Sequence, residues 1–189
     1  MFKKKIFIAI DTDKVLKAKK IIRDIQSNKI KIGYKFGLEF FYSKDGRKFL
    51  SNLKNQTIFL DLKLNDIPNT IKSALKSLKD LKISYMTVHL SSGFSALKTL
   101  KKDNKGIKIA GVTTLTSLNN KDLKEIGYNK KVNELVRHQA KLATKAKLDA
   151  IVCSGHEIRS VKRVFKKEII TPGIKIHNRK NDQKRVMKP

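Results

Sequence analysis

The sequence is poor in the residues that would tie it to an oxidising compartment or to a membrane. Its 189 residues include one cysteine, Cys153, so no disulfide can form within the chain, and this usage fits a reducing compartment. Every apolar run is far shorter than the roughly 18 residues that a membrane-spanning helix requires. Residues 1–11 have a basic start, but Asp11 ends the apolar run after five residues, too soon for a signal peptide. We therefore expect a cytoplasmic protein without a membrane partner.

Acidic residues are also scarce. The chain has 16 Asp and Glu against 44 Lys and Arg, a net charge of +28. A balance this basic is typical of proteins that bind nucleic acid or anionic membranes. The lysines, however, recur singly and in pairs along predicted helices, as in 14–24 and 72–82, and form no single basic block. We interpret them as solvated positions and do not expect nucleic acid to be a partner.

Short apolar runs alternate with longer segments of helical periodicity along the whole chain. Helical spacing of apolar residues covers segments such as 13–27, 67–81 and 132–148. This alternation predicts βαβ units, hence an α/β fold, and no linker suggests a second domain within residues 1–189. The predicted strands, rich in Ile, Val and Leu, are 5–10, 30–33, 57–63, 84–90, 108–115, 150–154 and 169–174.

Two α/β architectures fit this pattern, an open doubly wound sheet and a (β/α)8 barrel. A doubly wound nucleotide-binding fold has a glycine-rich turn after its first strand, where this chain has Asp11. Polar residues follow strand after strand, which is where a barrel gathers its catalytic groups. We therefore predict a (β/α)8 TIM barrel. These polar residues and segments are Asp11, Lys31, Asp61 with Lys63, His89, Thr116 and 171–173.

The count of strands is one short of a barrel. Eight strands and about 250 residues are typical of this fold, whereas seven runs can be counted here. We predict a single barrel domain over 1–189 that lacks the eighth strand and the final helix and is incomplete at its C-terminal end.

The end of the third predicted strand, FLDLKLNDIPNT at 59–70, carries an unusual group of charges. Side chains alternate along a strand, so Asp61 and Lys63 should share one face, with Asp66 just beyond them. Lys31, placed at the end of the neighbouring strand, should reach Asp61. The spacing alone fits a structural network of salt bridges equally well.

Such a cluster suits decarboxylation without a cofactor or a metal. A fixed carboxylate at Asp61 would repel a carboxylate on the substrate, and the Lys63 ammonium would stabilise the carbanion that forms. Lys63 would then donate a proton to the carbon that is left.

Longer strings in the sequence resemble the orotidine 5'-phosphate decarboxylase family. FLDLKLNDIPNT is similar to that family's signature. Other segments follow in the family's order over essentially the whole chain: AID, KIG, VH, VTTLTS, VCSGHE, TPGI and DQKRVMKP.

The resemblance implies roles for individual residues. Asp11 and Lys31 would bind the ribose of the nucleotide, and Lys31 would also touch Asp61. Lys63 would be the catalytic acid. The remaining expected contacts are Asp61 and Asp66 in the charged network, Asp66 and Thr70 reaching into the partner's site of a homodimer, Thr116 on the pyrimidine, and Gln183 closing over pyrimidine and phosphate.

The resemblance also implies the reaction. Orotidine 5'-monophosphate would lose carbon dioxide to give uridine 5'-monophosphate, the last step of pyrimidine nucleotide synthesis. Lys175 stands where the family usually has an arginine, so a point charge would replace a bidentate contact to the phosphate. The family has a Gly-Arg pair after its eighth strand, and no such pair follows the seventh predicted strand of this sequence.

Two single residues and two alternative functions also need an interpretation. We interpret His89 as a packed histidine and Cys153 as a buried thiol, and we expect no metal site. One alternative function is a metal-dependent sugar-phosphate decarboxylase or aldolase with the same charged core. The other is a degraded, non-catalytic basic protein that binds nucleic acid through its charge.

Overall fold

The computed structural model describes residues 5–25, 29–104, 106–173 and 184–185, and their strands form one parallel sheet. Its seven strands lie side by side in chain order, with β1 and β7 at the two edges, as expected for successive βαβ units. The strands are β1 Lys5–Ile10, β2 Lys31–Phe36, β3 Thr57–Leu64, β4 Tyr85–His89, β5 Lys108–Val112, β6 Ala150–Val152 and β7 Glu168–Ile170.

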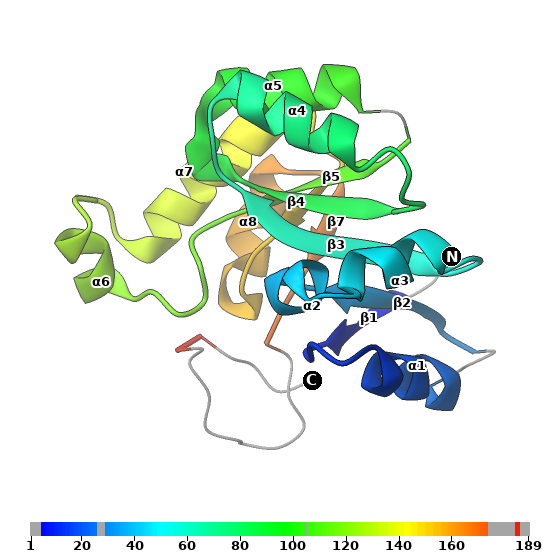
Figure 1. Cartoon of the computed structure of the whole chain (residues 1–189). Helices are drawn as coiled ribbons and strands as arrows, with labels where there is room; N and C mark the ends of the chain where they lie inside the picture. The colour runs from blue at the N-terminus through cyan, green and yellow to red at the C-terminus, as the bar shows by residue number, and fades with distance from the viewer. Residues whose placement is uncertain (1–4, 26–28, 105, 174–183, 186–189) are drawn as a thin grey trace.

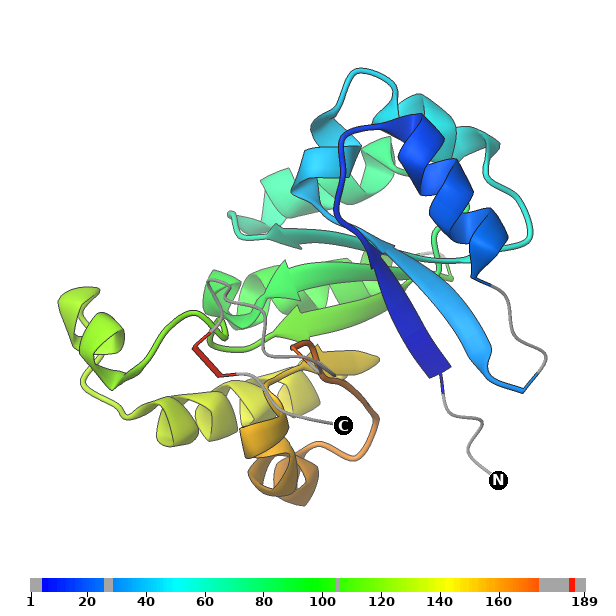
Figure 2. The ribbon, with the colours of Figure 1, turned by 90° about the horizontal axis from the view of Figure 1, so that it is seen from below.

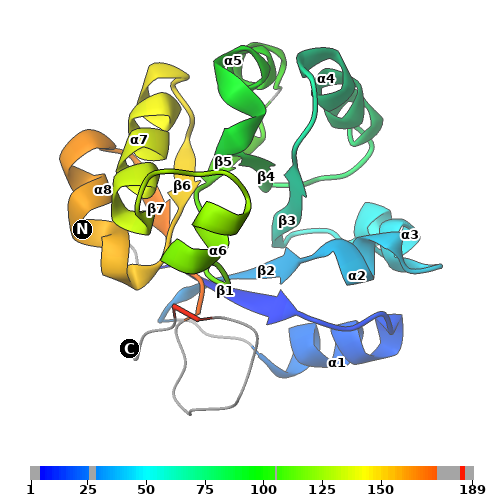
Figure 3. The same cartoon turned by 90° about the vertical axis from the view of Figure 1, so that its left-hand side faces the viewer.

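Helices surround the curved sheet on its outer side (Figures 1 and 3). In Figure 2, α1 with β1 and β2 (blue) lies to one side, and α7 with α8 (yellow to orange) to the other. The helices are α1 Val15–Asp24, α2 Leu38–Tyr42, α3 Gly46–Asn52, α4 Pro68–Ser77, α5 Gly93–Asp103, α6 Asn120–Glu125, α7 Val132–Lys145 and α8 Ile158–Val164, with 3-10 turns η1 Leu90–Ser92 and η2 Gly155–Glu157.

The α4 helix illustrates how the sequence builds this outer layer. Pro68 stands in its first turn, where a missing N–H costs nothing. Ile71, Leu75 and Leu78 recur at helical spacing and are all buried, so they form the stripe that packs on the sheet. None of the helices in the described part of the chain has the length and apolarity that crossing a membrane requires.

The concave side of the sheet is packed at the amino ends of the strands. Phe7 of β1 meets Tyr85 of β4 with ring centroids 5.2 Å apart, although these strands are not neighbours. Lys5 at the start of β1 lies 3.9 Å from Glu168 at the start of β7, so an ion pair links the two edge strands. The sheet therefore curves into most of a barrel, which confirms the predicted seven-stranded (β/α) barrel.

The second strand differs from its prediction. Residues 30–33 were predicted, but β2 runs over Lys31–Phe36, three residues further. Gly33 lies inside the strand, where a Cβ atom would lie only 2.7 Å from the ring of Phe7, so this glycine lets a neighbouring side chain approach the strand closely.

Candidate active site

Four charged residues of alternating sign line the carboxyl ends of the first three strands. The Lys63 ammonium lies 2.9 Å from Oδ2 of Asp61, which is only 8% exposed. Lys35 of β2 lies 3.6 Å from the same oxygen and 3.8 Å from Oδ1 of Asp11, just past β1. We call Asp11, Lys35, Asp61 and Lys63 the charged row. The predicted contact between Asp61 and Lys63 is confirmed.

The predicted contact of Lys31 with Asp61 is wrong. Lys31 begins β2, is exposed, and pairs in register with Lys5 at the amino end of β1. Lys35 lies four positions further along the strand, roughly 13 Å away at the usual rise. The error follows from ending the strand at Gly33. With the strand continued through Phe36, Lys35 falls at the carboxyl end and occupies the position expected of Lys31.

The backbone around Lys63 departs from a regular strand. Pairing of β3 with β4 shifts register between Leu60 and Leu64, and Lys63 has a φ of 48°. This left-handed conformation is uncommon for a residue with a side chain and costs of order 1–3 kcal/mol. Such bulges frequently re-aim a side chain beside an active site.

His89, the last residue of β4, is close enough to the charged row to respond to it. Burial lowers its pKa, the Lys63 ammonium lowers it further, and the Asp61 carboxylate acts in the opposite direction. With its pKa below the usual 6.5, His89 is neutral at pH 7 and adds no charge to the site. The sequence placed His89 at a strand end, but its electrostatic link to Lys63 was not foreseen.

Asp66 and Thr70 are not among the residues that pair within the charged row. Both are exposed, and the Asp66 carboxylate accepts a hydrogen bond from the N–H of Ile67 at 2.7 Å. Within the described ranges, no ion pair joins Asp66 to Lys63. We expected Asp61, Lys63 and Asp66 to form one compact group. Within a single chain, the residues that do pair are Asp61, Lys63 and Lys35.

Thr116 lies in a segment held by residues from the far end of the chain. The fifth strand was predicted to reach 115 but ends at Val112, so Thr116 follows in a loop. The Thr116 carbonyl accepts backbone hydrogen bonds from Lys184 and Arg185, at 3.0 and 3.1 Å. Gln183 and Lys175, predicted to touch the substrate, lie outside the described residues.

Arg185 makes a buried ion pair that the sequence did not reveal. Its guanidinium contacts the carboxylate of Glu157, and the two side chains are 12% and 2% exposed. It also donates to the carbonyls of Thr114 and Leu115, at 2.8 and 3.0 Å. The same residue therefore ties η2 to the loop that carries Thr116. The family strings VCSGHE and DQKRVMKP contain the two residues, but neither string indicated that they pair.

The thiol of Cys153 is buried in the native fold. It is 2% exposed. Burial raises its pKa to about 12, with the Glu157 carboxylate adding to the rise and Arg185 opposing it. The expected buried thiol is confirmed.

Because so little thiolate exists near neutral pH, we expect Cys153 to resist iodoacetamide at pH 8 in the native protein and to react fully in denaturant. Intact mass spectrometry counts the adducts. A native protein modified as fast as a free thiol peptide would contradict the burial.

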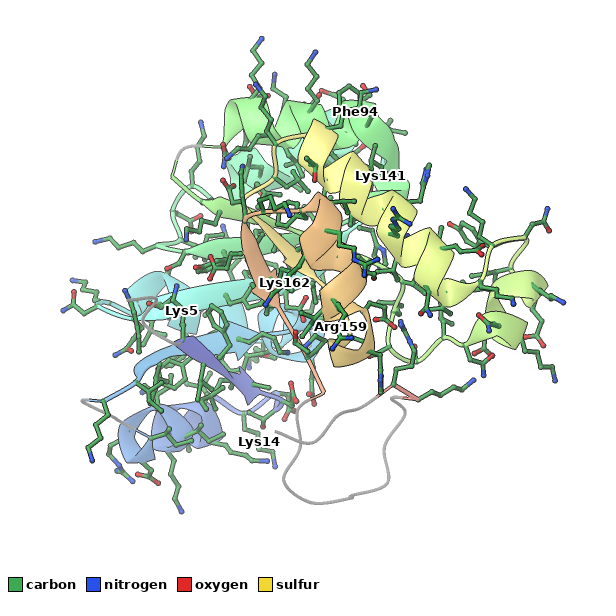
Figure 4. The ribbon with its side chains drawn as sticks, turned by 180° about the vertical axis from the view of Figure 1, so that it is seen from behind. Lys5, Lys14, Phe94, Lys141, Arg159 and Lys162 are labelled. Atoms are coloured by element: carbon green, nitrogen blue, oxygen red, sulfur yellow. The ribbon has the colours of Figure 1, made fainter. Side chains whose placement is uncertain are left out.

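Basic side chains are spread over the molecule. The labelled ones in Figure 4 come from separate elements: Lys5 from β1, Lys14 before α1, Lys141 from α7, and Arg159 with Lys162 from α8. Among the described residues, no group of three or more His, Cys, Asp or Glu is arranged to hold a metal ion.

The fold and the site together define a class. Parallel strands, outer helices and a charged row at the carboxyl ends are the arrangement of a (β/α)-barrel enzyme. The chain belongs to the orotidine 5'-phosphate decarboxylase / HUMPS family, whose model matches residues 4–189.

Individual relatives agree with this assignment. An orotidine 5'-phosphate decarboxylase of Carboxydothermus hydrogenoformans is 37% identical over 198 residues, covering 98% of this chain and 81% of the relative. The one of Wolbachia pipientis subsp. Culex pipiens is 41% identical over 161 residues, covering 82% and 71%. A solved orotidine 5'-phosphate decarboxylase of Lactobacillus acidophilus superposes with a TM-score of 0.77 at 28% identity, covering 91% of this chain and 82% of the other.

Proposed function

We propose that this protein decarboxylates orotidine 5'-monophosphate to uridine 5'-monophosphate without a cofactor or a metal. The observation that carries the proposal is the Lys63 ammonium, 2.9 Å from a nearly buried Asp61 at the mouth of the barrel. An ammonium held there by a fixed carboxylate can both stabilise an anion and supply a proton.

The chemistry follows from the charges in the row. The substrate carboxylate would lie near Asp61, and their repulsion is relieved when the bond from the ring to the carboxylate breaks. The electron pair of that bond stays on the ring carbon, where the Lys63 ammonium stabilises it. Lys63 then transfers a proton to this carbon, carbon dioxide leaves, and the lysine is reprotonated from solvent.

The remaining contacts to the nucleotide extend from the same mouth. We assign the ribose to Asp11 and to Lys35, which replaces Lys31 in this role because it is the lysine at the carboxyl end of β2. Thr116 is proposed to hydrogen-bond the pyrimidine. Lys175 and Gln183 keep their predicted contacts with the phosphate and with the pyrimidine and phosphate, respectively.

A homodimer belongs to the same proposal. Asp66 and Thr70 would reach the partner's site, which is consistent with the exposure of both side chains. Ile67 between them is 67% exposed, and a subunit interface there would cover this apolar side chain. We also place the enzyme in the cytoplasm, in line with its single cysteine.

Turnover in the presence of a chelator tests the proposal. We expect purified protein to convert orotidine 5'-monophosphate, followed by ultraviolet absorbance, at the same rate with and without EDTA. Uridine 5'-monophosphate should bind saturably in calorimetry.

Either of two results would contradict the proposal. Loss of activity with EDTA, restored by a divalent metal, would favour the sugar-phosphate alternative. Absence of nucleotide binding, with steeply salt-dependent binding of polynucleotides, would favour the basic-protein alternative.

A further inference from the structure

One buried hydroxyl connects the two central members of the charged row. Thr87, in the middle of β4, is 0% exposed. Its Oγ1 accepts a hydrogen bond from the backbone N–H of Lys63 at 2.7 Å and donates one to Oδ1 of Asp61 at 3.0 Å. Both directions are unambiguous, because an amide can only donate and an ionised carboxylate can only accept.

The position of Thr87 coincides with the irregularity in β3. Leu60 pairs with Met86 and Leu64 with Val88, so β3 advances by four residues while β4 advances by two. Thr87 alone therefore faces the stretch from Asp61 to Lys63. Its side chain takes the Lys63 N–H, which cannot follow the regular ladder with φ at 48°.

This arrangement fixes both oxygens of Asp61. Oδ1 accepts from Thr87, while Oδ2 faces the ammonium groups of Lys63 and Lys35. The carboxylate cannot rotate without losing one of these contacts. The same hydroxyl also holds the backbone of Lys63, from which the side chain with its ammonium extends.

We infer that Thr87 is a positioning residue for the decarboxylation, acting through Asp61 and Lys63. The inference rests on the proposed function for its catalytic consequence. The Thr87 hydroxyl is fully buried and makes both of its hydrogen bonds within the protein, so it would affect the rate by holding Asp61 and Lys63 in place. Misplacement of a reacting group by about 1 Å can lower the rate about 100-fold.

Two substitutions separate the hydroxyl from the shape of the side chain. Thr87→Val keeps the branched shape and removes both hydrogen bonds, whereas Thr87→Ser keeps the hydroxyl. We expect Thr87→Val to lower kcat by about 10- to 100-fold while the affinity for uridine 5'-monophosphate changes by less than about threefold. Thr87→Ser should stay within a few-fold of the parent.

A control variant removes a hydroxyl elsewhere. Thr144 of α7 is exposed, and its single hydroxyl proton has the carbonyls of Ala140 and Val164 as acceptors, on elements other than β3 and β4. Thr144→Val makes the same chemical change as Thr87→Val, and it should leave kcat at the parental value. Equal losses of kcat in Thr144→Val and Thr87→Val would overturn the inference, as would parental kcat in Thr87→Val or a Thr87→Ser variant as slow as Thr87→Val.

A second measurement does not depend on turnover. By NMR, the Lys63 amide should exchange with solvent at least about tenfold faster in Thr87→Val than in the parent or Thr87→Ser, because its acceptor is gone. Equal exchange rates would overturn the positioning role. If Thr87→Val fails to fold, Thr87→Ala takes its place in both assays. If the parent neither binds uridine 5'-monophosphate nor turns over, the proposed function fails by itself, and amide exchange alone decides whether Thr87 positions Lys63.

Discussion

Replacing Lys63 by alanine is expected to lower the turnover of orotidine 5'-monophosphate by about 10³- to 10⁴-fold. A general acid contributes up to about 10⁴-fold, and loss of the cation that stabilises the carbanion adds to the deficit. Asp61 would keep only Lys35, 3.6 Å away, as its partner in the row. The measurement is kcat from absorbance, with radioactive carbon dioxide release for the slow variant.

The control must lose the same charge without touching the site. Lys141 is exposed on α7, so Lys141→Ala changes the net charge equally and should keep parental kcat. Uridine 5'-monophosphate binding, measured by calorimetry, should survive in both variants. If Lys63→Ala retained turnover within about tenfold of the parent, Lys63 would be no more than an electrostatic neighbour of the reaction.

Replacing Arg185 by methionine is expected to cause the largest loss of stability, about 3–5 kcal/mol. The cause is Glu157, which is 2% exposed and would be left as a buried carboxylate without its cation. Among the described residues, its Oε2 already has no hydrogen-bond partner, so little else can compensate. The free energy of unfolding in urea measures the effect.

Two further variants test whether the loss of stability comes from the buried ion pair or from any change near the C-terminus. Lys184 pairs with Asp122 at the surface, so Lys184→Met should leave the unfolding midpoint unchanged. The double variant Arg185→Met with Glu157→Leu should regain most of the loss, because no unpaired charge remains. A single Arg185→Met variant that unfolds at the parental midpoint would contradict the account.

The positions of the strands and the polar character of their carboxyl ends could be predicted from the sequence, because both depend on local patterns. Apolar runs located all seven strands, and the polar residues at their ends favoured the barrel. The Asp61 and Lys63 contact followed from the alternation of side chains, even though the strand bulges there. Family strings then indicated the chemistry.

The missed features depend on contacts between distant segments. The second strand was predicted to end at 33, and nothing in the sequence showed that Phe7 lies against Gly33 within a longer strand. Thr87 is an ordinary β-branched residue in an apolar run, and its role arises only from the bulge of the neighbouring strand. Glu157 and Arg185 are 28 positions apart, with no periodicity to connect them.

The central claim is that Lys63 delivers a solvent-exchangeable proton to the ring carbon from which carbon dioxide departs. The most direct measurement is turnover of orotidine 5'-monophosphate in deuterated water, with the product examined by NMR and mass spectrometry. The account predicts one carbon dioxide released for each uridine 5'-monophosphate formed, with a single deuterium at the carbon that carried the carboxylate. Carbon dioxide release without deuterium at that carbon, or no release at all, would contradict it.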